Sequence, residues 1–574
     1  MRFAYKGLPS EDTEEVILGR LFAYDHPALV IDVETVSLKD TTLIGIGVSP
    51  NSREAYYFPV LPEPSPYLEW VKGLIKGAGL RIFHNAMFDL EVLGVDGRPF
   101  ADTSIMAQMQ GLPASLRDLA HFYLCSEIKE ISDILPARHN MLDVSTETVA
   151  SKCMDDCLHT FRLWEKFGGR AWDGNEGHTW THHPNYQGGY DPLEPTSHYV
   201  SPGMKDCYQV DIRLIPLLRR MSKRGIALRP GQVRGWYEIV SKEALFYGDI
   251  VKKEGIKSIG VPVNPGSNQQ VGLLLASRKN VLPLTKSRKK RQLRVDEETL
   301  EGLDDPLARV VLLYREKTKL RSTYLKPWLG EERAWTHFRL DLATRRLASF
   351  NRNLQNIPKP IRIIFAPDGE TWTKIDDNQI EMRMLAYLSQ DPVMMKAYRE
   401  GSDIHATTQA KLWPLSGLED EAVRTRAKVF NFMMVFYASV PALSVKTKLT
   451  KPVCATYRGE WLDLYKGVRK YMDRQMEESG RGWEESIYGR RMRLPSLDIA
   501  TVEHRNKCAI NYPPQGSAAD VVKRQMLMLE DYDIALQVHD ELLMDGDEPL
   551  PEGLDRIFPE IHTPFKRIVH PVWY

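Results

Sequence analysis

One long segment without hydrophobic periodicity divides the chain and constrains its fold more than any other feature. Residues 168–202 (GGRAWDGNEGHTWTHHPNYQGGYDPLEPTSHYVSP) have a composition typical of a linker or a long loop. Before it, ALVIDVETVSLKDTTLIGIGVS predicts two strands, and RIFHNAMFDLEVL and TVASKCMDDCLHTFRLWEKF have helical character. After it, residues 204–330 are mostly helical in pattern. With 574 residues the chain is too long for one core, so we expect an α/β unit followed by a larger part.

Composition narrows the class of protein. Lys plus Arg and Asp plus Glu each number 76, so the formal net charge is zero and any positive surface for nucleic acid must be local. Six cysteines without a CxxC pair indicate a reducing compartment. No apolar run at the start is of signal-peptide type, and no stretch reaches the ~18 apolar residues of a membrane span. We expect a soluble protein of the cytoplasm.

Two strand-like segments each end at a carboxylate, and a strand end can present such a side chain to a cleft. In TWTKIDDNQIEMRMLAYL, a buried strand over residues 371–375 gives way to a helix, and Asp376 lies at the junction. In IALQVHDELLMD, two apolar strand halves flank His539, Asp540 and Glu541, which predicts a hairpin with a carboxylate at its tip. Carboxylates from separate strands suit a two-Mg²⁺ site for phosphoryl transfer. Taken alone, an Asp after a strand is more often a helix cap.

A basic and aromatic face is predicted between these two segments. In AVRTRAKVFNFMMVFY, Arg424, Lys428 and Phe432 are four residues apart and lie along one helix face. Two cations and a ring suit a nucleoside triphosphate, and the apolar neighbours argue against a merely solvated basic face. The basic run KSRKKRQLR (286–294) predicts a loop that grips phosphates, although most charge runs are solvated surfaces.

Seven ordered segments resemble DNA polymerase family A, the bacterial DNA polymerase I type. IDDNQIEMRMLA resembles the family pattern DYSQIELR, RTRAKVFNF resembles RxxxKxxNF, and QVHDEL matches the third polymerase motif. TRRLASFNRNLQNIP, SDIHATT, SIYGRRMRLP and NYPPQGSAADVVKRQM are similar to other segments of that family. The resemblance covers roughly residues 204–574. It implies a right-hand polymerase with thumb, palm and fingers.

The resemblance also implies a role for each matching residue. Asp376 and Asp540 would hold two Mg²⁺, for which Mn²⁺ can substitute, and Glu541 would support the primer end or a metal. Glu381 matches the residue that blocks a ribose 2′-hydroxyl. The incoming dNTP would meet Arg424, Lys428, Phe432, Phe436, His405, Gln379 and Glu381. Primer and template would meet Arg346, Asn353, Gln355, Lys507, Gln515 and His539, largely in the minor groove, where contacts test pairing without reading sequence.

Three positions depart from the family pattern. Asp377 and Asn378 replace the usual Tyr-Ser. Phe436 stands where the family has a Tyr before Gly, and a one-residue shift would instead bring Tyr437 to that place, so this register stays open. Lys507 replaces an Arg, which keeps the charge but loses the planar fork.

Carboxylates of a second site lie before residue 168. In IDVET, Asp32 and Glu34 are two apart in a strand and point to one side. HNAMFD supplies Asp89, and MDDCLHTFRLW supplies Asp156 or, in the other register, Asp155. Four carboxylates can hold two divalent metals and activate water to cut a terminal phosphodiester. Asp-x-Glu is common by chance, but this order resembles the proofreading 3′–5′ exonuclease of the DEDD superfamily, with an RNase H-like fold.

Lys152 departs from that second pattern. The family normally has Tyr four residues before the last Asp, where this chain has Lys152. The metal ligands are present but the group that orients water is not, so we expect weak proofreading. A Lys near several carboxylates would stay charged and donate hydrogen bonds without acting as a base.

The expected fold class is a multidomain chain of α/β and α+β type, an RNase H-like DEDD exonuclease followed by a right-hand polymerase. The predicted boundaries are 1–167 for the exonuclease, 168–203 for a linker or inserted loop, 204–340 for the thumb and start of the palm, 341–383 for the palm with the first catalytic Asp, 384–505 for the fingers, and 506–574 for the palm with the second.

The expected activity is addition of dNTPs to a primer 3′ end, with proofreading, in DNA replication. The expected partners are primer–template DNA, dNTPs and replisome proteins such as a helicase or processivity factor, with no membrane. The compact form suggests a bacteriophage enzyme, which would act in the host cytoplasm, and a bacterial source is an alternative. A single-subunit RNA polymerase or reverse transcriptase is one rival, against which Glu381 and the QVHDE core argue. A catalytically dead DNA-binding protein is another, against which Asp376, Asp540 and Lys428 argue.

Overall fold

The computed structural model describes most of the chain. The described residues are 3–8, 12–22, 26–37, 40–95, 97, 99–135, 139–172, 201–278, 293, 295–413, 420–558 and 560–573. Most of the predicted linker (173–200) and nearly all of the predicted basic loop (286–294, except Leu293) lie outside the described residues. Among the helices that are described, none is both long and apolar enough to cross a membrane.

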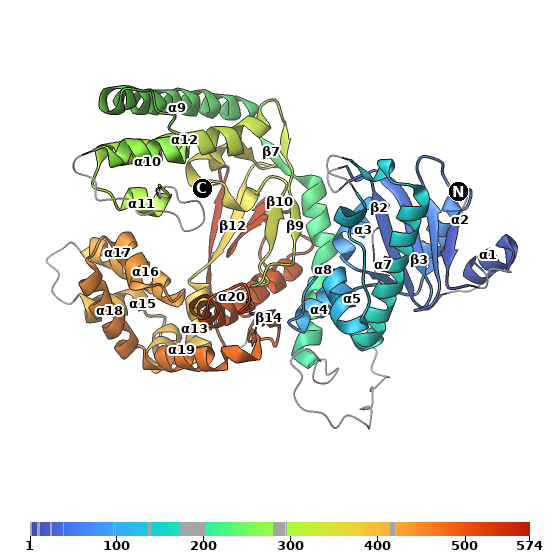
Figure 1. The fold of residues 1–574 in the computed structure, drawn as a ribbon. Coiled ribbons are helices and arrows are strands. Elements are labelled where there is room, and N and C mark those ends of the chain that lie inside the picture. The colour runs from blue at the N-terminus through green and yellow to red at the C-terminus, as the bar shows by residue number, and fades with distance from the viewer. Residues whose placement is uncertain are drawn as a thin grey trace.

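The N-terminal unit is built on a six-stranded sheet with the strand order β1-β4-β3-β2-β5-β6 (Figure 1). β1 to β4 pair antiparallel, whereas β2, β5 and β6 run parallel. The strands are β1 (Ala4–Lys6), β2 (Leu29–Thr35), β3 (Leu43–Ser49), β4 (Ala55–Pro59), β5 (Arg81–Phe83) and β6 (Phe100–Asp102). The two strands predicted over 28–49 are therefore β2 and β3. The start of RIFHNAMFDLEVL, predicted as helical, is instead strand β5 because RIF pairs with β2 and β6.

The helices in the described part of this unit flank the sheet, and α7 packs across β2, β3 and β4. The close approach needs a glycine, because a Cβ on Gly47 of β3 would lie 2.6 Å from the Cys153 sulfur of α7. The helices are α1 (Glu14–Phe22), α2 (Leu68–Gly77), α3 (Ala86–Leu93), α4 (Thr103–Met109), α5 (Leu116–Leu124), α6 (Ile131–Ile134) and α7 (Thr146–Lys166), with 3₁₀ turns at Met141–Asp143 and Gly169–Trp172. This packing sets α7 directly over β2.

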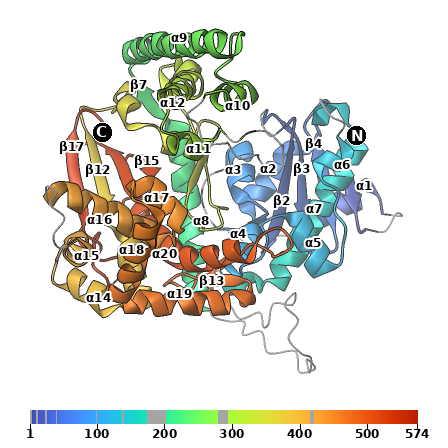
Figure 2. The ribbon, with the colours of Figure 1, turned by 60° about the vertical axis from the view of Figure 1, so that its left-hand side comes forward.

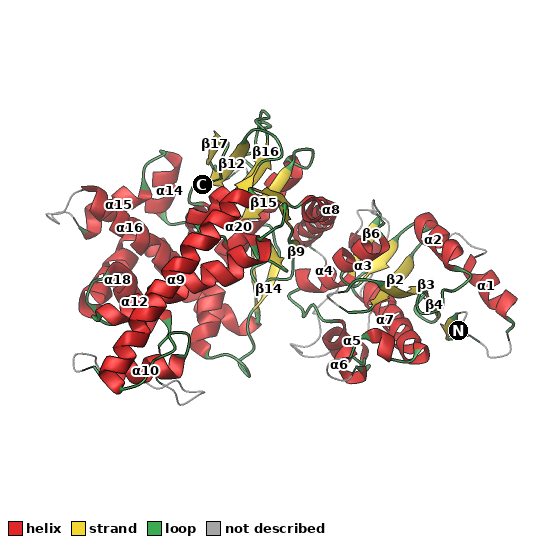
Figure 3. Cartoon of the chain, turned by 90° about the horizontal axis from the view of Figure 1, so that it is seen from above, coloured by secondary structure: helices red, strands yellow, loops and turns green. Residues whose placement is uncertain are grey.

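Helix α8 (Pro202–Arg224) lies between the N-terminal unit and the rest of the chain (Figure 3). It contacts α3, α4 and β6 on one side and α20, β9 and β15 on the other. Arg219 of α8 donates to the carbonyls of Leu90 and Val95. The fully buried Arg490 donates to Asp211 of α8 at 2.6 Å. These contacts tie the two parts of the chain together.

A four-stranded antiparallel sheet, ordered β15-β16-β12-β17, is the centre of the C-terminal part. Its strands are β12 (Trp372–Asp377), β15 (Ile534–Val538), β16 (Glu541–Asp545) and β17 (Phe565–His570). The long helix α20 (Val502–Met528) packs against α13 (Ile380–Ser389). Smaller sheets pair β7 (Ile226–Leu228) with β8 (Arg333–Ala334) and β11 (Phe365–Ala366), β9 (His337–Arg339) with β10 (Ala348–Phe350), and β13 (Trp483–Glu485) with β14 (Arg491–Arg493).

Two helical groups lie at different ends of this sheet (Figures 1 and 2). One comprises α9 (Pro230–Ile259), α10 (Asn268–Ala276), α11 (Glu297–Glu301) and α12 (Pro306–Lys319), and the other comprises α14 (Pro392–Arg399), α15 (Ile404–Leu412), α16 (Asp420–Val435), α17 (Val440–Thr447), α18 (Lys451–Leu464) and α19 (Lys466–Glu478). Each group has its own buried apolar cluster. Short turns complete the chain: a π-helix at Leu320–Leu325 and 3₁₀ helices at Lys326–Trp328, Leu354–Asn356, Lys359–Ile364 and Ser479–Arg481.

Candidate active sites

The carboxylates of Asp376 and Asp540 lie near each other at one end of the C-terminal sheet. Asp376 of β12 lies opposite Glu541 of β16 in the strand register, and the Asp377 N–H donates to the Asp540 carbonyl at 3.1 Å. Asp540 lies in the tight turn between β15 and β16, where His539 has a left-handed backbone (φ 57°). The predicted hairpin is thus formed, although β12 extends through Asp376 rather than ending before it.

Asp540 lies in surroundings that disfavour its charge. Burial and the nearby charge of Asp376 raise the pKa of Asp540 to about 6. A cation beside the two carboxylates would offset this repulsion, and oxygen ligands of this kind suit hard divalent ions. The residues present therefore fit a divalent metal.

Asp377, which replaces the family Tyr, points to the other face of β12 because side chains alternate along a strand. It is only 3% exposed, and Gln525 of α20 donates to its Oδ1 at 3.0 Å. The second oxygen, Oδ2, is buried and has no hydrogen-bond partner among the described residues. Burial, together with the charges of Asp540 and Asp376, raises its pKa to about 7.

Glu541 is engaged by other side chains. Its carboxylate accepts from the indole of Trp573 at 2.5 Å and lies 3.4 Å from Arg362 and 3.5 Å from Lys374. These contacts favour a role in anchoring the strand over direct metal ligation. The catalytic role that the resemblance implies for Glu541 stays a prediction.

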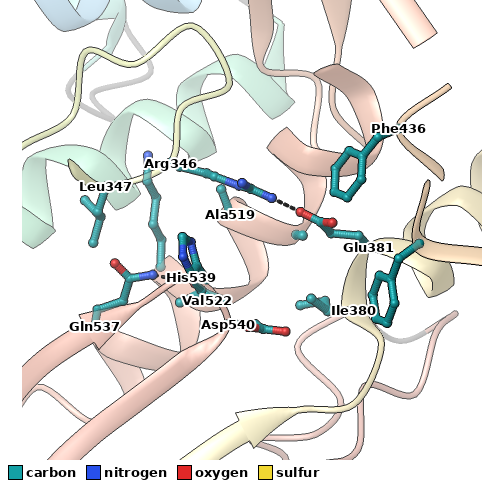
Figure 4. A pocket seen from close by; sticks show the side chains of 13 residues that line it. Arg346, Leu347, Ile380, Glu381, Phe436, Ala519, Val522, Gln537, His539 and Asp540 are labelled. Atoms are coloured by element: carbon teal, nitrogen blue, oxygen red, sulfur yellow. Dashed lines mark hydrogen bonds and ion pairs between the residues drawn. The ribbon is translucent and has the colours of Figure 1, made fainter. Parts of the chain in front are cut away.

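A cavity of about 360 Å³ opens beside Asp540 (Figure 4). Glu381, at the start of α13, points across it to form an ion pair with Arg346. The lining residues are Arg346, Leu347, Ile380, Glu381, Phe432, Phe436, Ala518, Ala519, Val522, Lys523, Gln537, His539 and Asp540. Six of them were predicted as site residues from separate segments, and the fold brings them together here.

Phe436, rather than Tyr437, faces this cavity. Phe436 is one turn beyond Phe432 and lines the cavity with it. Tyr437 has a left-handed backbone (φ 50°), its hydroxyl lies 3.8 Å from the Met476 sulfur, and its ring lies under the Arg458 guanidinium. The geometry therefore favours Phe436 in the family Tyr position that the sequence left open.

A cluster of polar side chains lies at α15 and α16. Arg424 pairs with Asp403 at 2.7 Å, the adjacent Lys428 is exposed, and the rings of His405 and Phe432 are 5.9 Å apart. Gln379, which precedes α13, accepts from the Tyr398 hydroxyl at 3.2 Å. Burial, helped by the cations of Lys428 and Arg424, lowers the pKa of His405 to about 4, so this ring is neutral near pH 7.

The proton of neutral His405 is fixed by its neighbours. The Trp461 indole, which can only donate, bonds to Asn431 Oδ1 at 2.7 Å. Asn431 therefore turns its amide nitrogen to His405 Nδ1, 2.9 Å away, and Nδ1 must accept. The proton then lies on Nε2, which is buried and has no partner among the described residues. His405 therefore carries a buried Nε2–H that no described residue accepts.

Of the six residues predicted to touch primer and template, two line the cavity and the other four do not. Arg346 and His539 line the cavity. Gln355 is buried, accepts from Ser349 N at 2.8 Å and donates to Gln537 Oε1 at 2.8 Å. Asn353 is exposed beside Ser349, whereas Gln515 and Lys507 lie on α20, half-buried and exposed respectively.

Sequence reasoning missed Gln537 and Lys523, although both lie in quoted motifs. Gln537 lines the cavity and bonds to Gln355. Lys523 is buried and pairs with Asp211 at 2.7 Å, and burial, with the charge of Arg490, lowers its pKa to about 8. Their partners are far away in sequence, so no local pattern indicated them.

The second carboxylate cluster lies between β2, α3 and α7 of the N-terminal unit. Glu34 of β2 and Asp156 of α7 are joined by Lys152, whose Nζ lies 2.7 Å from a carboxylate oxygen of each. Asp155 points outward and pairs with Lys6, so of the two predicted registers the fold brings Asp156 to the cluster.

The acids of this cluster are buried and repel one another. Burial raises the pKa of Asp32, Glu34, Asp89 and Asp156, and neighbouring carboxylates raise it further in each case. Burial alone would lower the pKa of Lys152, but the charges of Asp156, Glu34 and Asp32 raise it well above its usual value. Asp32, Glu34 and the Cys153 thiol offer ligand atoms within 4.8 Å of one another. A buried, oxygen-rich cluster of this kind fits a divalent metal.

Sites that hold two metal ions occur in phosphatases, nucleases and polymerases, where the ions stabilise both oxygens of a phosphoryl displacement. A family model described as DNA polymerase family A matches residues 242–561, and one described as 3′-5′ exonuclease matches residues 10–170. The first match covers more than half of the chain, which belongs to DNA polymerase family A. The predicted family and fold class are thereby confirmed, and such domains generally use divalent metals.

Individual relatives agree with this family. The chain is 29% identical over 589 residues to a DNA polymerase I of Chloroflexus aurantiacus, covering 93% of this chain and 59% of that protein. It is 30% identical over 382 residues to the thermostable DNA polymerase I of Thermus aquaticus, covering 62% and 45%. The chain spans 59% and 58% of the length of the Chloroflexus aurantiacus and Borreliella burgdorferi relatives.

One solved structure has the same fold along nearly the whole chain. It is described as the POL domain of Pol1 from M. smegmatis in complex with DNA primer-template and dNTP. The TM-score is 0.73 at 20% identity, and 98% of each chain is covered. At this identity the likeness shows the fold.

Proposed function

We propose that this chain is a template-directed DNA polymerase that adds dNTPs to a primer 3′ end and proofreads with a 3′–5′ exonuclease. The observation that carries the proposal is the cavity beside Asp540, which Glu381, Phe432 and Phe436 line from two other segments. A nucleotide in that cavity would have the acid at its reacting end and the rings over its base and sugar. The relative solved with primer-template and dNTP supports the same substrates here.

Each group has a defined task in the proposed reaction. Asp376 and Asp540 would hold two divalent ions, which we take to be Mg²⁺, with Mn²⁺ as a substitute. When bound, the ions supply charge that stabilises the attacking 3′-oxygen and the leaving pyrophosphate. Arg424, Lys428 and the Nε2–H of His405 bind the triphosphate.

The shape of the cavity would select deoxynucleotides as substrates. The Glu381 carboxylate, held by Arg346, lies where a 2′-hydroxyl of the sugar would enter, which favours deoxynucleotides. Phe432 and Phe436 would pack on the sugar and base. On the duplex side, Gln355 donates to Gln537 Oε1 and so fixes the Gln537 amide. One N–H of that amide donates to the His539 carbonyl, and the other would serve minor-groove acceptors, which are common to all base pairs.

The N-terminal cluster is proposed as the proofreading site. Asp32, Glu34, Asp89 and Asp156 would hold metal and bring water to the terminal phosphodiester. The proposed domains are the exonuclease at 1–167, the linker at 168–203, thumb and start of palm at 204–340, palm at 341–383 and 506–574, and fingers at 384–505. We also propose replisome proteins such as a helicase or processivity factor as partners; the bacteriophage origin stays a prediction.

A primer-extension assay tests both activities. With dNTPs and Mg²⁺ the primer should lengthen, and without dNTPs it should shorten. Replacing dNTPs by ribonucleotides separates this proposal from an RNA polymerase, and an RNA template separates it from a reverse transcriptase. A protein that binds the duplex but leaves the primer unchanged in all mixtures would be the DNA-binding alternative, and the proposal would be wrong.

A further inference from the structure

Lys152 occupies the middle of the N-terminal carboxylate cluster. It lies one helical turn before Asp156, on the same face of α7, and its Nζ is 2.7 Å from Asp156 Oδ2 and 2.7 Å from Glu34 Oε1. The Lys152 side chain is 12% exposed, and those of Glu34 and Asp156 are 4% and 11% exposed. The ammonium therefore bridges a strand and a helix at the point where both present acids.

This arrangement differs from an ordinary buried salt bridge. A buried ammonium is costly unless it is paired and hydrogen-bonded, and here two carboxylates satisfy it. Both partners belong to the group of four acids that fits a metal, so the ammonium neutralises the same charges that a divalent ion would. The Lys152–Glu34 contact joins residues 118 apart in sequence and so links α7 to β2.

The other two acids of the cluster are engaged differently. Among the described residues, the Asp32 carboxylate has only a weak side-chain donor, the Cys153 thiol at 3.1 Å. Asp89 is buried on α3, and the backbone N–H of Val33 donates to its carboxylate. Neither of the two is hydrogen-bonded to Lys152 in the described part of the chain.

We propose that Lys152 is a built-in cation that takes the place of one divalent ion, so that this cluster binds a single ion, held at Asp32, in place of two. The inference rests on the proposed exonuclease function of the cluster. It makes Lys152 a part of the site rather than the loss of a tyrosine. It also gives the cluster a stable folded form without metal.

Counting bound Mn²⁺ tests this directly. The full-length chain carrying Asp376→Asn and Asp540→Asn, which removes the polymerase-site ligands, would be titrated with Mn²⁺ and followed by electron paramagnetic resonance. Thymidine monophosphate would be present to supply the product's phosphate oxygens. We expect one ion per chain with Lys152 and two with Lys152→Met, which keeps the length and removes the charge. Equal counts in the two proteins would overturn the proposal.

A matched control and a second readout accompany the count. Lys6→Met removes a lysine that pairs with Asp155, the neighbour of Asp156, on the exposed side of α7, and should leave the count at one. In EDTA, Lys152→Met should melt below the Lys152 protein and recover with Mn²⁺, whereas Lys6→Met should show no such recovery. Lys152→Gln, which keeps a donor without the charge, replaces Lys152→Met if that variant does not fold.

Digestion of a labelled single strand separates the two claims. If strands are degraded but the ion count is the same with and without Lys152, the inference about Lys152 fails and the exonuclease function stands. If Lys152→Met gains an ion but no variant degrades DNA in Mg²⁺ or Mn²⁺, the exonuclease function fails while the cation role of Lys152 is supported.

Discussion

The buried Asp377 should make folding stability depend on pH. Burial raises the pKa of this acid from 3.8 to about 7, against the opposing hydrogen bond from Gln525 and with help from the charges of Asp540 and Asp376. The unfolded chain releases the proton near 3.8, so the folded state binds it more tightly. The stabilisation is thus complete below pH 3.8 and is lost as the pH rises to about 7.

The size of the effect follows from the shift. Each pKa unit corresponds to 1.36 kcal/mol, so about three units amount to roughly 4 kcal/mol lost by pH 8. Asp377→Asn removes the titration and keeps the acceptor for Gln525, but leaves an amide N–H unpaired, at about 1–3 kcal/mol. The variant should therefore be more stable than the parent at pH 8 by roughly 1–3 kcal/mol.

Urea unfolding in EDTA at pH 5 and pH 8 measures this difference without metal. Going from pH 5 to pH 8, the advantage of Asp377→Asn over the parent should grow by up to about 3 kcal/mol, because the parent loses its proton in this range and the variant has none to lose. A difference that is the same at both pH values would refute the reasoning and show that Asp377 is already charged at pH 5.

Three further variants probe the nucleotide cavity. Glu381→Ala should admit ribonucleotides, because the carboxylate that crowds the 2′ position is gone; unchanged discrimination in a competition assay would contradict this role. Phe432→Tyr should increase dideoxynucleotide termination in a sequencing ladder, since the added hydroxyl can stand in for the missing 3′-hydroxyl. His405→Ala should raise the KM for dNTP about 10–100-fold, because a hydrogen bond to a charged phosphate contributes about 1.5–3 kcal/mol; steady-state kinetics would check it.

Features with a local pattern could be predicted from the sequence. The two apolar halves of IALQVHDELLMD predicted the hairpin with Asp540 at its tip, and the four-residue spacing predicted the α16 face with Arg424, Lys428 and Phe432. Strand β5 was mistaken for helix because its three residues are fixed by pairing with β2, which no local pattern carries. The choice of Phe436 over Tyr437 also depends on where α16 ends, which the left-handed backbone at Tyr437 decides.

Contacts between distant residues could not be predicted. Lys152 and Glu34 are 118 residues apart, so the sequence marked Lys152 as a departure without revealing that it bridges two acids. Likewise, Gln525 reaches Asp377 across 148 residues. The tautomer of His405 depends on Trp461, through Asn431, and only the packing of α15, α16 and α18 brings these three together.

The central claim, that Asp376 and Asp540 form the metal site of a DNA polymerase, is tested most directly by single-turnover primer extension with Asp540→Asn. Loss of a metal ligand should remove several kcal/mol of transition-state stabilisation, a fall of about 10³-fold or more in rate. Degradation of a labelled single strand by the same preparation should be unchanged, because that reaction uses the other cluster. Extension by Asp540→Asn at a rate near that of the parent protein would contradict the assignment.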